Sequence, residues 1–182
     1  MEKFQVHFGY LKGGFSPEKI EPLKFGGFKR TDPIWNKPKG SFWTCPLRWD
    51  KILGWSSDWL RYNFSFDYEI NFAIIFEVKK NIEVVKIDSI KDLEKISTLR
   101  TFNSCGEEEK LRNINFERIN QKNIAGIYIT AKGITELSDP CVGESLGIES
   151  IYGWDFESTA WLHAGWFESY HIHEVKDYRI VG

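Results

Sequence analysis

Hydrophobic and polar residues alternate near the start of the chain, over residues 4–10. A period of two is typical of a β-strand with one buried face, so this stretch predicts a strand. Its polar face presents His7 beside Gly9, and a glycine in a strand lets another group approach the backbone closely. The opposite face carries Phe4, Val6 and Phe8.

Longer apolar and alternating runs predict the remaining strands. Residues 71–78 are almost continuously apolar, as in a central strand that is covered on both faces. Pro46 ends a short strand that begins at Gly40. Further strands are expected at 82–87, 124–130, 157–162 and 170–181.

Helical spacing of apolar residues predicts helices between these strands. Asp, Ser and Asn are favourable N-cap residues, and such residues stand before two of the helical patterns. The helices are expected over 50–63, over 90–96 after a cap at Asp88 or Ser89, and over 116–120 after a cap at Asn115.

Three segments have no periodic pattern. Residues 11–40 are rich in Gly, Pro and Lys, and such a long irregular segment is typical of a binding loop or a lid. The charge run Glu107–Lys110 predicts a solvated helix start or a loop. Residues 138–147 are expected to form another loop.

The order of these elements indicates the fold class. Strands come in groups at both ends of the chain with helices between them, which favours an α+β fold over a doubly wound parallel sheet. A length of 182 residues suits one domain, so we expect a single domain over residues 1–182.

Composition adds one unusual feature, an aromatic content of 16% with eight tryptophans. Such rings fill cores, and they also stack on sugars and bases. The net charge of −2 provides no overall attraction to nucleic acid or to an anionic membrane. Three cysteines without CxxC spacing argue against a disulfide framework. No signal-like start and no apolar run near 18 residues are present, so we expect a cytoplasmic protein without a membrane partner.

Common catalytic motifs are absent from the sequence. It contains no phosphate-binding GxxxxGK[ST], no GxGxxG, no GxSxG and no HExxH. His163, His171 and His173 could in principle bind zinc, but no carboxylate or cysteine stands at a convincing spacing from them. We therefore predict no metal site.

Two carboxylates, Asp155 and Glu157, lie two residues apart between aromatic side chains. In an extended segment both would point to the same face. Two negative charges beside buried rings require a positive or hydrogen-bonding partner. The pattern is typical of a functional site, or of a structural cluster in which Asp155 pairs with Arg48, Arg61 or Lys24.

Three features in chain order resemble the motifs of the ADP-ribosyltransferase superfamily. His7-Phe8-Gly9 is similar to the His-x-Gly of that family's first strand. Gly40-Ser41-Phe42-Trp43-Thr44 is similar to its second motif, in which a glycine precedes aromatic and hydroxyl residues, although many members carry tyrosine where Phe42 or Trp43 stands here. Asp155-Phe156-Glu157 resembles its late Glu-x-Glu element, with Asp155 in place of the first glutamate.

The resemblance implies NAD as the substrate, and a fold of two packed, mostly antiparallel sheets with peripheral helices. Glu157 stands at the position of the catalytic glutamate, and Asp155 is a supporting or structural charge. Cleavage of the nicotinamide–ribose bond passes through an oxocarbenium-like transition state, which a nearby carboxylate stabilises. The NAD contacts that the resemblance implies come from His7, Phe8, Gly9, Ser41, Phe42, Trp43 and Thr44.

The first hypothesis is therefore an NAD-dependent ADP-ribosyltransferase that modifies a macromolecule, as a toxin or a phage-related effector. Its acceptor is a nucleic-acid base or a protein side chain. Water as the acceptor and a partner that neutralises the activity are left open. The alternative is a non-catalytic binding module whose aromatic surface binds single-stranded nucleic acid or a protein.

Overall fold

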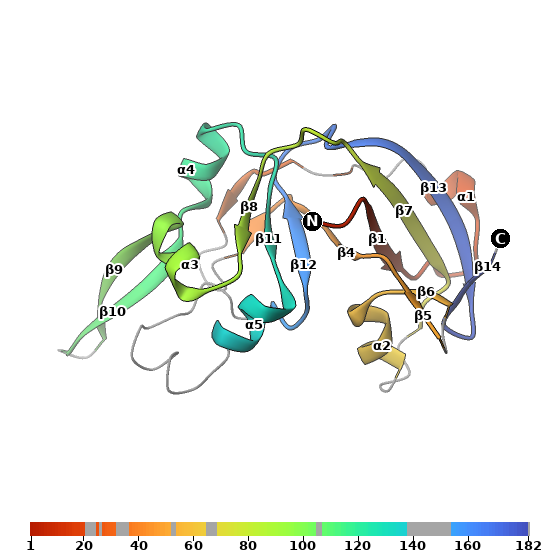
Figure 1. Ribbon diagram of the computed structural model, residues 1–182, viewed down its shortest axis with the longest axis horizontal. Helices are drawn as coiled ribbons and strands as arrows, with labels where there is room; N and C mark the ends of the chain where they lie inside the picture. Colours follow the sequence, from red (N-terminus) through yellow and green to blue (C-terminus); the bar gives the residue numbers. More distant parts are fainter. Residues whose placement is uncertain are drawn as a thin grey trace.

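An eight-stranded sheet forms the centre of the computed structural model, which describes residues 1–20, 25, 27–31, 37–51, 54–64, 69–104, 107–137 and 154–181 (Figure 1). Its strands, in order across the sheet, are β14 (Arg179–Val181), β13 (Phe167–Lys176), β7 (Phe72–Val78), β1 (Phe4–Gly9), β4 (Phe42–Pro46), β12 (Ser158–Trp161), β11 (Gly126–Ile129) and β8 (Val84–Ile87).

Strands from distant parts of the chain are neighbours in this sheet. β1 pairs antiparallel with both β4 and β7, and β4 pairs antiparallel with β12. β8 and β11 form the one parallel pair among the described strands. Figure 1 shows β8, β11 and β12 running in a different direction from β1, β7 and β13, which is compatible with the predicted two-sheet layout. The structure thus mixes a large sheet with few helices.

The strand register divides the side chains of the central strands between two faces, because direct partners in an antiparallel pair share a face. Val6 pairs with Cys45, and Trp43 pairs with Ala160, so these four residues lie on one face. Gln5, Thr44 and Thr159 lie on the other face.

Helices cover the face that carries Val6 and Trp43, which we call the helix face. Leu60 of α2 (Asp58–Phe64) packs with Val6 and Phe8. Residues of α3 (Ile90–Ile96), α4 (Phe116–Gln121) and α5 (Ala131–Leu137) pack in a second cluster with Ile127, Ile129 and Ala160. No helix in the described part of the chain combines the length and the apolar composition that crossing a membrane requires.

The other face, which we call the aromatic face, is covered by rings and by the short helix α1 (Pro17–Ile20). Trp161 and Trp166 stack with ring centroids 4.0 Å apart and planes 2° apart, and both are fully buried. Phe76 packs against Trp166 at 4.8 Å. Burying a large apolar side chain contributes about 1.5–3 kcal/mol, so much of the unusual aromatic content stabilises this core.

Most of the predicted elements are confirmed. The alternating first segment forms β1, and the predicted strands within 40–46, 71–78, 82–87, 124–130 and 157–162 form β4, β7, β8, β11 and β12. The last predicted strand forms β13 and β14, which turn at Asp177 and Tyr178. Helices α3 and α4 occupy the predicted positions, with Ser89 as the N-cap of α3 and Asn115 accepting a 2.9 Å hydrogen bond from the Arg118 amide.

Two predictions are wrong. The charge run Glu107–Lys110 belongs to β10 (Glu107–Ile114), which pairs with β9 (Ser97–Ser104), because pairing with another strand decides the conformation there and no local pattern reveals it. The predicted helix over 50–63 forms only as α2. Its first part contributes to a hairpin of β5 (Arg48–Asp50) and β6 (Gly54–Ser56), where Gly54 has a φ of 73°.

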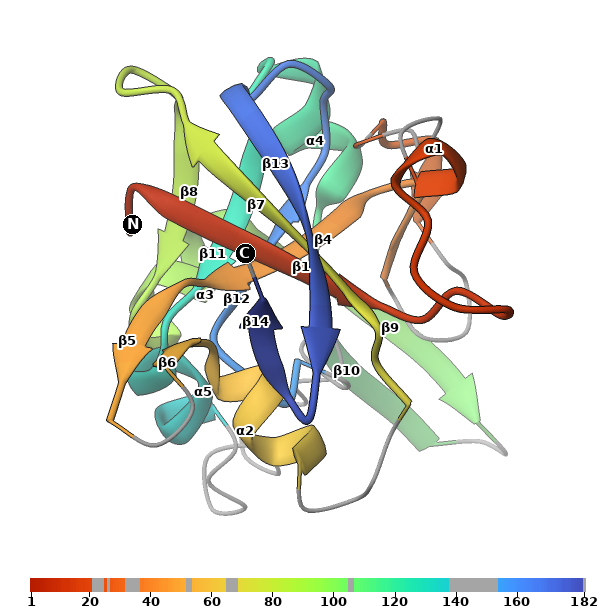
Figure 2. The same cartoon turned by 90° about the vertical axis from the view of Figure 1, so that its right-hand side faces the viewer.

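The irregular segment 11–40 contains α1 and the short strands β2 (Arg30–Thr31) and β3 (Pro38–Lys39). The loop predicted over 138–147 lies outside the described residues. Figure 2 shows β5 and β6 beside α2, as Figure 1 does. The ion pair between Arg61 of α2 and Asp50 of β5, at 2.6 Å, joins the hairpin to this helix.

Gly133 in α5 allows the helix to lie directly on β8. A Cβ atom at this position would stand 2.3 Å from the backbone oxygen of Ile87. We expect Gly133→Ala to lower the free energy of unfolding by about 1–3 kcal/mol through overpacking, although helix propensity alone favours alanine by about 1 kcal/mol. Chemical denaturation measures the change, with the exposed neighbour Lys132→Ala as the control. A stabilised Gly133→Ala variant would contradict this packing.

Candidate active site

A cavity of about 350 Å³ opens on the helix face where β1, β4 and the start of β12 meet. Its lining comes from three consecutive residues of β1, three of β4, the helix α2, and the segment that leads into β12. These lining residues are Val6, His7, Phe8, Trp43, Thr44, Cys45, Trp59, Asp155, Phe156 and Ser158, together with Lys37. The three strands therefore meet at one cavity although 30 or more residues separate each from the next in the sequence.

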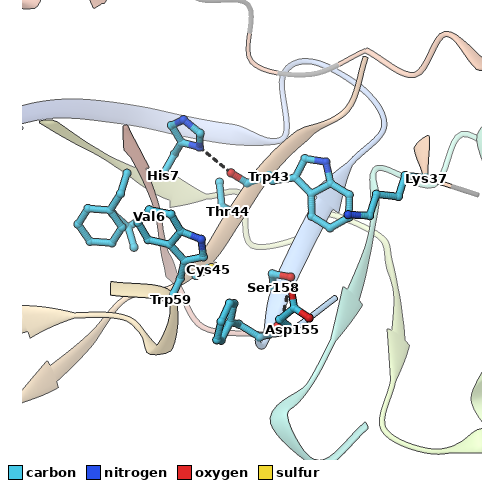
Figure 3. A pocket seen from close by; sticks show the side chains of 11 residues that line it. Val6, His7, Lys37, Trp43, Thr44, Cys45, Trp59, Asp155 and Ser158 are labelled. Carbon is cyan, nitrogen blue, oxygen red and sulfur yellow. Dashed lines mark hydrogen bonds between the residues drawn. The ribbon is translucent and has the colours of Figure 1, made fainter. Parts of the chain in front are cut away.

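Two indole rings stand on opposite sides of this cavity (Figure 3). Trp59 stacks on Phe8 with ring centroids 5.8 Å apart and planes 7° apart. Trp43 packs against the buried ring of Trp154, at 4.6 Å. Because each indole is supported by a second ring, the two walls are held in place before any ligand enters.

Asp155 supplies the carboxylate of the cavity. Its side chain is exposed, and no hydrogen bond or ion pair joins it to another residue that the structure describes. Figure 3 shows Asp155 beside Ser158, whose hydroxyl donates a 3.0 Å hydrogen bond to the Phe156 carbonyl. That hydroxyl still has acceptor capacity. The cavity thus offers a ligand a carboxylate and a neighbouring hydroxyl oxygen, and its lining also includes the cationic Lys37.

Glu157 lies outside this cavity, in a buried ion pair. Arg48 binds it with two parallel hydrogen bonds, Nη1 to Oε2 at 2.7 Å and Nη2 to Oε1 at 2.9 Å. The Tyr128 hydroxyl also donates to Oε1. Burial alone would raise the pKa of Glu157, but the Arg48 guanidinium and the Tyr128 hydroxyl outweigh it and hold this pKa below its usual value. Glu157 is therefore charged, and both of its carboxylate oxygens already accept hydrogen bonds.

The two carboxylates do not share a face, contrary to the prediction from period-two geometry. That prediction required an extended segment, but β12 begins only at Ser158, and residues 154–157 are not part of a strand. Tyr128, which contacts Glu157, pairs with Thr159, so Glu157 is on the side of the aromatic face. The sequence suggested that Asp155 could form an ion pair with Arg48, but in the structure Glu157 forms this pair.

His7 borders the cavity and is neutral. Its Nδ1 is 2.9 Å from the Trp43 carbonyl oxygen, and because a carbonyl only accepts, Nδ1 carries the proton. Burial lowers the pKa of His7, against the opposing effect of this hydrogen bond. The ring packs against Phe42 at 4.6 Å and Phe72 at 6.3 Å. The ring therefore lies on the aromatic face, opposite to the helix face on which the cavity opens.

The other predicted site residues divide between the cavity and the interior. Phe8, Trp43 and Thr44 line the cavity with His7 and Asp155. The Thr44 hydroxyl donates to the Gln5 side-chain oxygen at 3.0 Å and accepts from Trp161 Nε1 at 2.8 Å, so it is committed to the core. Outside the cavity lie Gly9, Ser41, Phe42 and Glu157.

Sequence reasoning did not select Trp59, Cys45, Lys37 and Ser158 as site residues. Trp59 belongs to a helical stripe of apolar residues, a pattern that is equally typical of side chains in a hydrophobic core. Only the packing of α2 brings Trp59 to β1. Cys45 is a lining residue without reactivity, because burial raises the pKa of its thiol to about 12 and keeps it protonated. Lys37 lies within the irregular segment 11–40, where no periodic pattern predicts which way a side chain points.

No group of three His, Cys, Asp or Glu side chains within the described ranges could hold a metal ion. His171 and His173 lie on β13 with ring centroids 6.5 Å apart.

Comparison of the chain with protein-family models, with curated proteins and with solved structures found no match.

Proposed function

We propose that the protein is an NAD-dependent ADP-ribosyltransferase that modifies a macromolecule in the cytoplasm, with the arrangement of strands that the family resemblance implies. One observation carries the proposal. The first two resembling motifs lie on β1 and β4, and the third leads directly into β12. These three strands are consecutive neighbours in the sheet, and they meet at a cavity that contains a carboxylate and two indole rings. Nothing in the sequence order of these motifs requires such a meeting.

The cavity suits the nicotinamide end of NAD. A volume of about 350 Å³ lies within the usual range for small-molecule sites. Planar rings stack favourably on indoles, so Trp43 or Trp59, which line the cavity from opposite sides, would offer the nicotinamide ring a stacking surface. His7 supports the Trp43 wall from the other face of the sheet, because its Nδ1 holds the Trp43 carbonyl.

The reaction needs charge stabilisation at the ribose. The bond between ribose C1′ and the ring nitrogen breaks, its electron pair leaves with neutral nicotinamide, and positive charge develops on the ribose. Asp155, in the cavity and without a described partner, stabilises this charge. The acceptor's nucleophilic atom then bonds to C1′ and loses its proton. Catalysis of this kind depends on orientation and electrostatics.

This assignment reverses the roles expected for the two carboxylates. Glu157 matches the family's catalytic position, but Arg48 and Tyr128 occupy its oxygens and its side chain is 4% exposed. We assign Glu157 a positioning role, in which the Arg48 pair anchors the segment that carries Asp155. Asp155 is then the group that meets the reacting sugar.

Incubating the protein with NAD and separate pools of DNA, RNA and protein tests the proposal. We expect nicotinamide release together with a mass gain of one ADP-ribosyl group on one of the pools. Omitting NAD is the control for unrelated modification. Absence of both nicotinamide release and mass gain with every pool would contradict the proposal.

One observation favours a second function, a non-catalytic binding module. Trp49 and Trp55 face each other across the β5–β6 hairpin, 5.6 Å apart, and they are 65% and 49% exposed. Exposed indoles stack on bases of single-stranded nucleic acid and also anchor protein partners. In that case Trp55→Ala would reduce binding, whereas removing the charge of Asp155 would leave binding unchanged.

A further inference from the structure

We infer that the free edge of β13 pairs with the same edge of a second copy of this chain, in an antiparallel dimer centred on His171. The inference goes beyond the proposed function, since no residue of β13 lines the cavity. It rests on an unpaired stretch of strand that is bounded at both ends and has His171 as its midpoint.

β13 has a neighbouring strand on one side only over most of its length. β7 pairs with it from Phe167 to Glu174, whereas β14 pairs with it only from Glu174 to Lys176. Figure 2, which faces this side of the sheet, shows β14 beside only the lower end of β13. Over 167–173 β13 is thus an edge strand, and an unpaired edge is a template for pairing with another chain.

The backbone groups of Tyr170 and Ile172 point to this open side. The Val175 amide donates to the carbonyl of Asn71, just before β7, at 3.0 Å, so the odd-numbered residues of β13 bond toward β7. Even-numbered residues point the other way, as Lys176 does toward β14 across a two-residue turn. Within the described ranges, no backbone group bonds to Tyr170 or Ile172 on that side.

The ends of the open stretch determine the register of the dimer. A register shift between Phe167 and Ser169 marks a β-bulge at one end, and β14 occupies the edge from Glu174 at the other. The regular open stretch is therefore 169–173, with His171 in the middle. Opposite residues of antiparallel strands share a face, so the two-fold axis between identical strands coincides with a residue position. Any centre other than His171 would bring the bulge or β14 into the contact.

This register places compatible apolar side chains opposite each other on the aromatic face. Tyr170 lies opposite the partner's Ile172, and aromatic side chains pair favourably with β-branched ones. The two-fold symmetry forms this pair twice, and each pair exchanges backbone hydrogen bonds. Both side chains are half-buried and pack against the cluster that contains Phe76 and Trp166. The dimer would extend this cluster across the contact.

The helix face of the contact would consist of His171, His173 and Ser169. His171 lies opposite the partner's His171 at the axis, and His173 lies opposite the partner's Ser169. Histidine gains a positive charge as the pH falls, and like charges directly opposite each other destabilise a strand pair. Acidification should therefore weaken the dimer.

The neighbouring elements do not place a free carboxylate against His171. β7 places Ile75 opposite it, and Glu77, the next residue of β7 on that face, is bound by Lys3 at 2.8 Å. α1, with Glu18 and Lys19, lies on the aromatic face, away from the histidines.

Sedimentation velocity of the full chain, over micromolar to near-millimolar concentrations, measures the dimer. We expect a reversible dimer at neutral pH, with a dissociation constant at least about tenfold higher at about pH 5, where circular dichroism checks that the fold is kept. A chain that stays monomeric at every concentration would overturn the inference and leave this edge to a strand of another protein. A dimer of equal strength at both pH values would overturn the role of the histidines.

Variants assign the contact to this edge. His171→Lys places two permanent like charges at the axis and should raise the dissociation constant at least about tenfold at neutral pH. His171→Thr is neutral and favours a strand, so it should keep the dimer. Gln121→Lys, which adds the same charge on α4, is the matched control. These positions are exposed, so the variants should fold as the wild-type chain does. A dimer that His171→Lys leaves intact would overturn the inference.

Disulfide formation tests the register. His171 would form a non-hydrogen-bonded pair with its partner copy, in which the Cα atoms are about 4.5 Å apart, and this separation suits a disulfide. Mild oxidation of His171→Cys should give a covalent dimer on a non-reducing gel. The wild-type chain, with its own three cysteines, and Gln121→Cys should not. If His171→Cys sediments as a dimer but forms no covalent dimer, the register centred on His171 is wrong. None of these measurements uses NAD, so they are independent of the transferase function.

Discussion

Glu157→Ala is expected to destabilise the fold by about 2–4 kcal/mol. Breaking a buried ion pair is costly because the remaining charge loses its partner, typically by 3–5 kcal/mol. We expect a somewhat smaller cost here, because Arg48 is 41% exposed and water can partly solvate it after the change. Tyr128 would also lose the acceptor of its hydroxyl.

The pH dependence of this stabilisation has a definite sign. The pKa of Glu157 in the fold lies below that of the unfolded chain, so the ion pair contributes fully above the unfolded carboxyl pKa of about 4.3. That contribution is lost as the pH falls through the lower pKa of the folded state. The difference in unfolding free energy between the wild-type chain and Glu157→Ala should therefore shrink at acidic pH.

Urea denaturation at neutral and at acidic pH measures both effects. Glu2→Ala is the matched control, because Glu2 also contacts Arg48, at 3.4 Å, but is 49% exposed. Exposed ion pairs contribute about 0–1 kcal/mol, so this variant should unfold almost as the wild-type chain does. Equal destabilisation by the two substitutions would contradict the structural role of Glu157.

Asp155→Asn is expected to lower the rate of nicotinamide release from bound NAD by about 10²–10³-fold. This is the usual cost of removing one electrostatic group that stabilises the charge of a transition state. The substitution keeps the size of the side chain, and because Asp155 has no described partner, its effect on the unfolding free energy should be within about 0.5 kcal/mol.

Single-turnover measurements with saturating NAD separate this effect on the chemical step from weaker binding. Asp177→Asn removes the same charge far along the chain and should retain the wild-type rate. If Asp155→Asn released nicotinamide at the wild-type rate, Asp155 would have no role in the reaction.

Local patterns in the sequence predicted the elements that local forces determine. The alternation over residues 4–10 and the apolar run over 71–78 appear as neighbouring strands β1 and β7 because their side chains must be covered on the expected faces. Asn115 caps α4 as expected, since the cap bond involves residues only three positions apart.

The details of the site depended on contacts that no local pattern contains. Arg48 and Glu157 are 109 residues apart, and their pairing decides which of the two carboxylates stays in the cavity. The face prediction for Asp155 and Glu157 assumed a strand that starts two or three residues too early. Trp59 entered the site only because α2 packs on β1, and the β5–β6 hairpin before it replaced the first half of a predicted helix.

We propose that the cavity at β1, β4 and β12 breaks the nicotinamide–ribose bond of NAD. Chromatographic measurement of nicotinamide released from NAD by the purified chain tests it most directly, with Asp155→Asn assayed in parallel. We expect release that grows with time and protein concentration and that falls at least about 100-fold in the variant. Release that is no faster than in protein-free buffer, or that is equal in the two proteins, would contradict it.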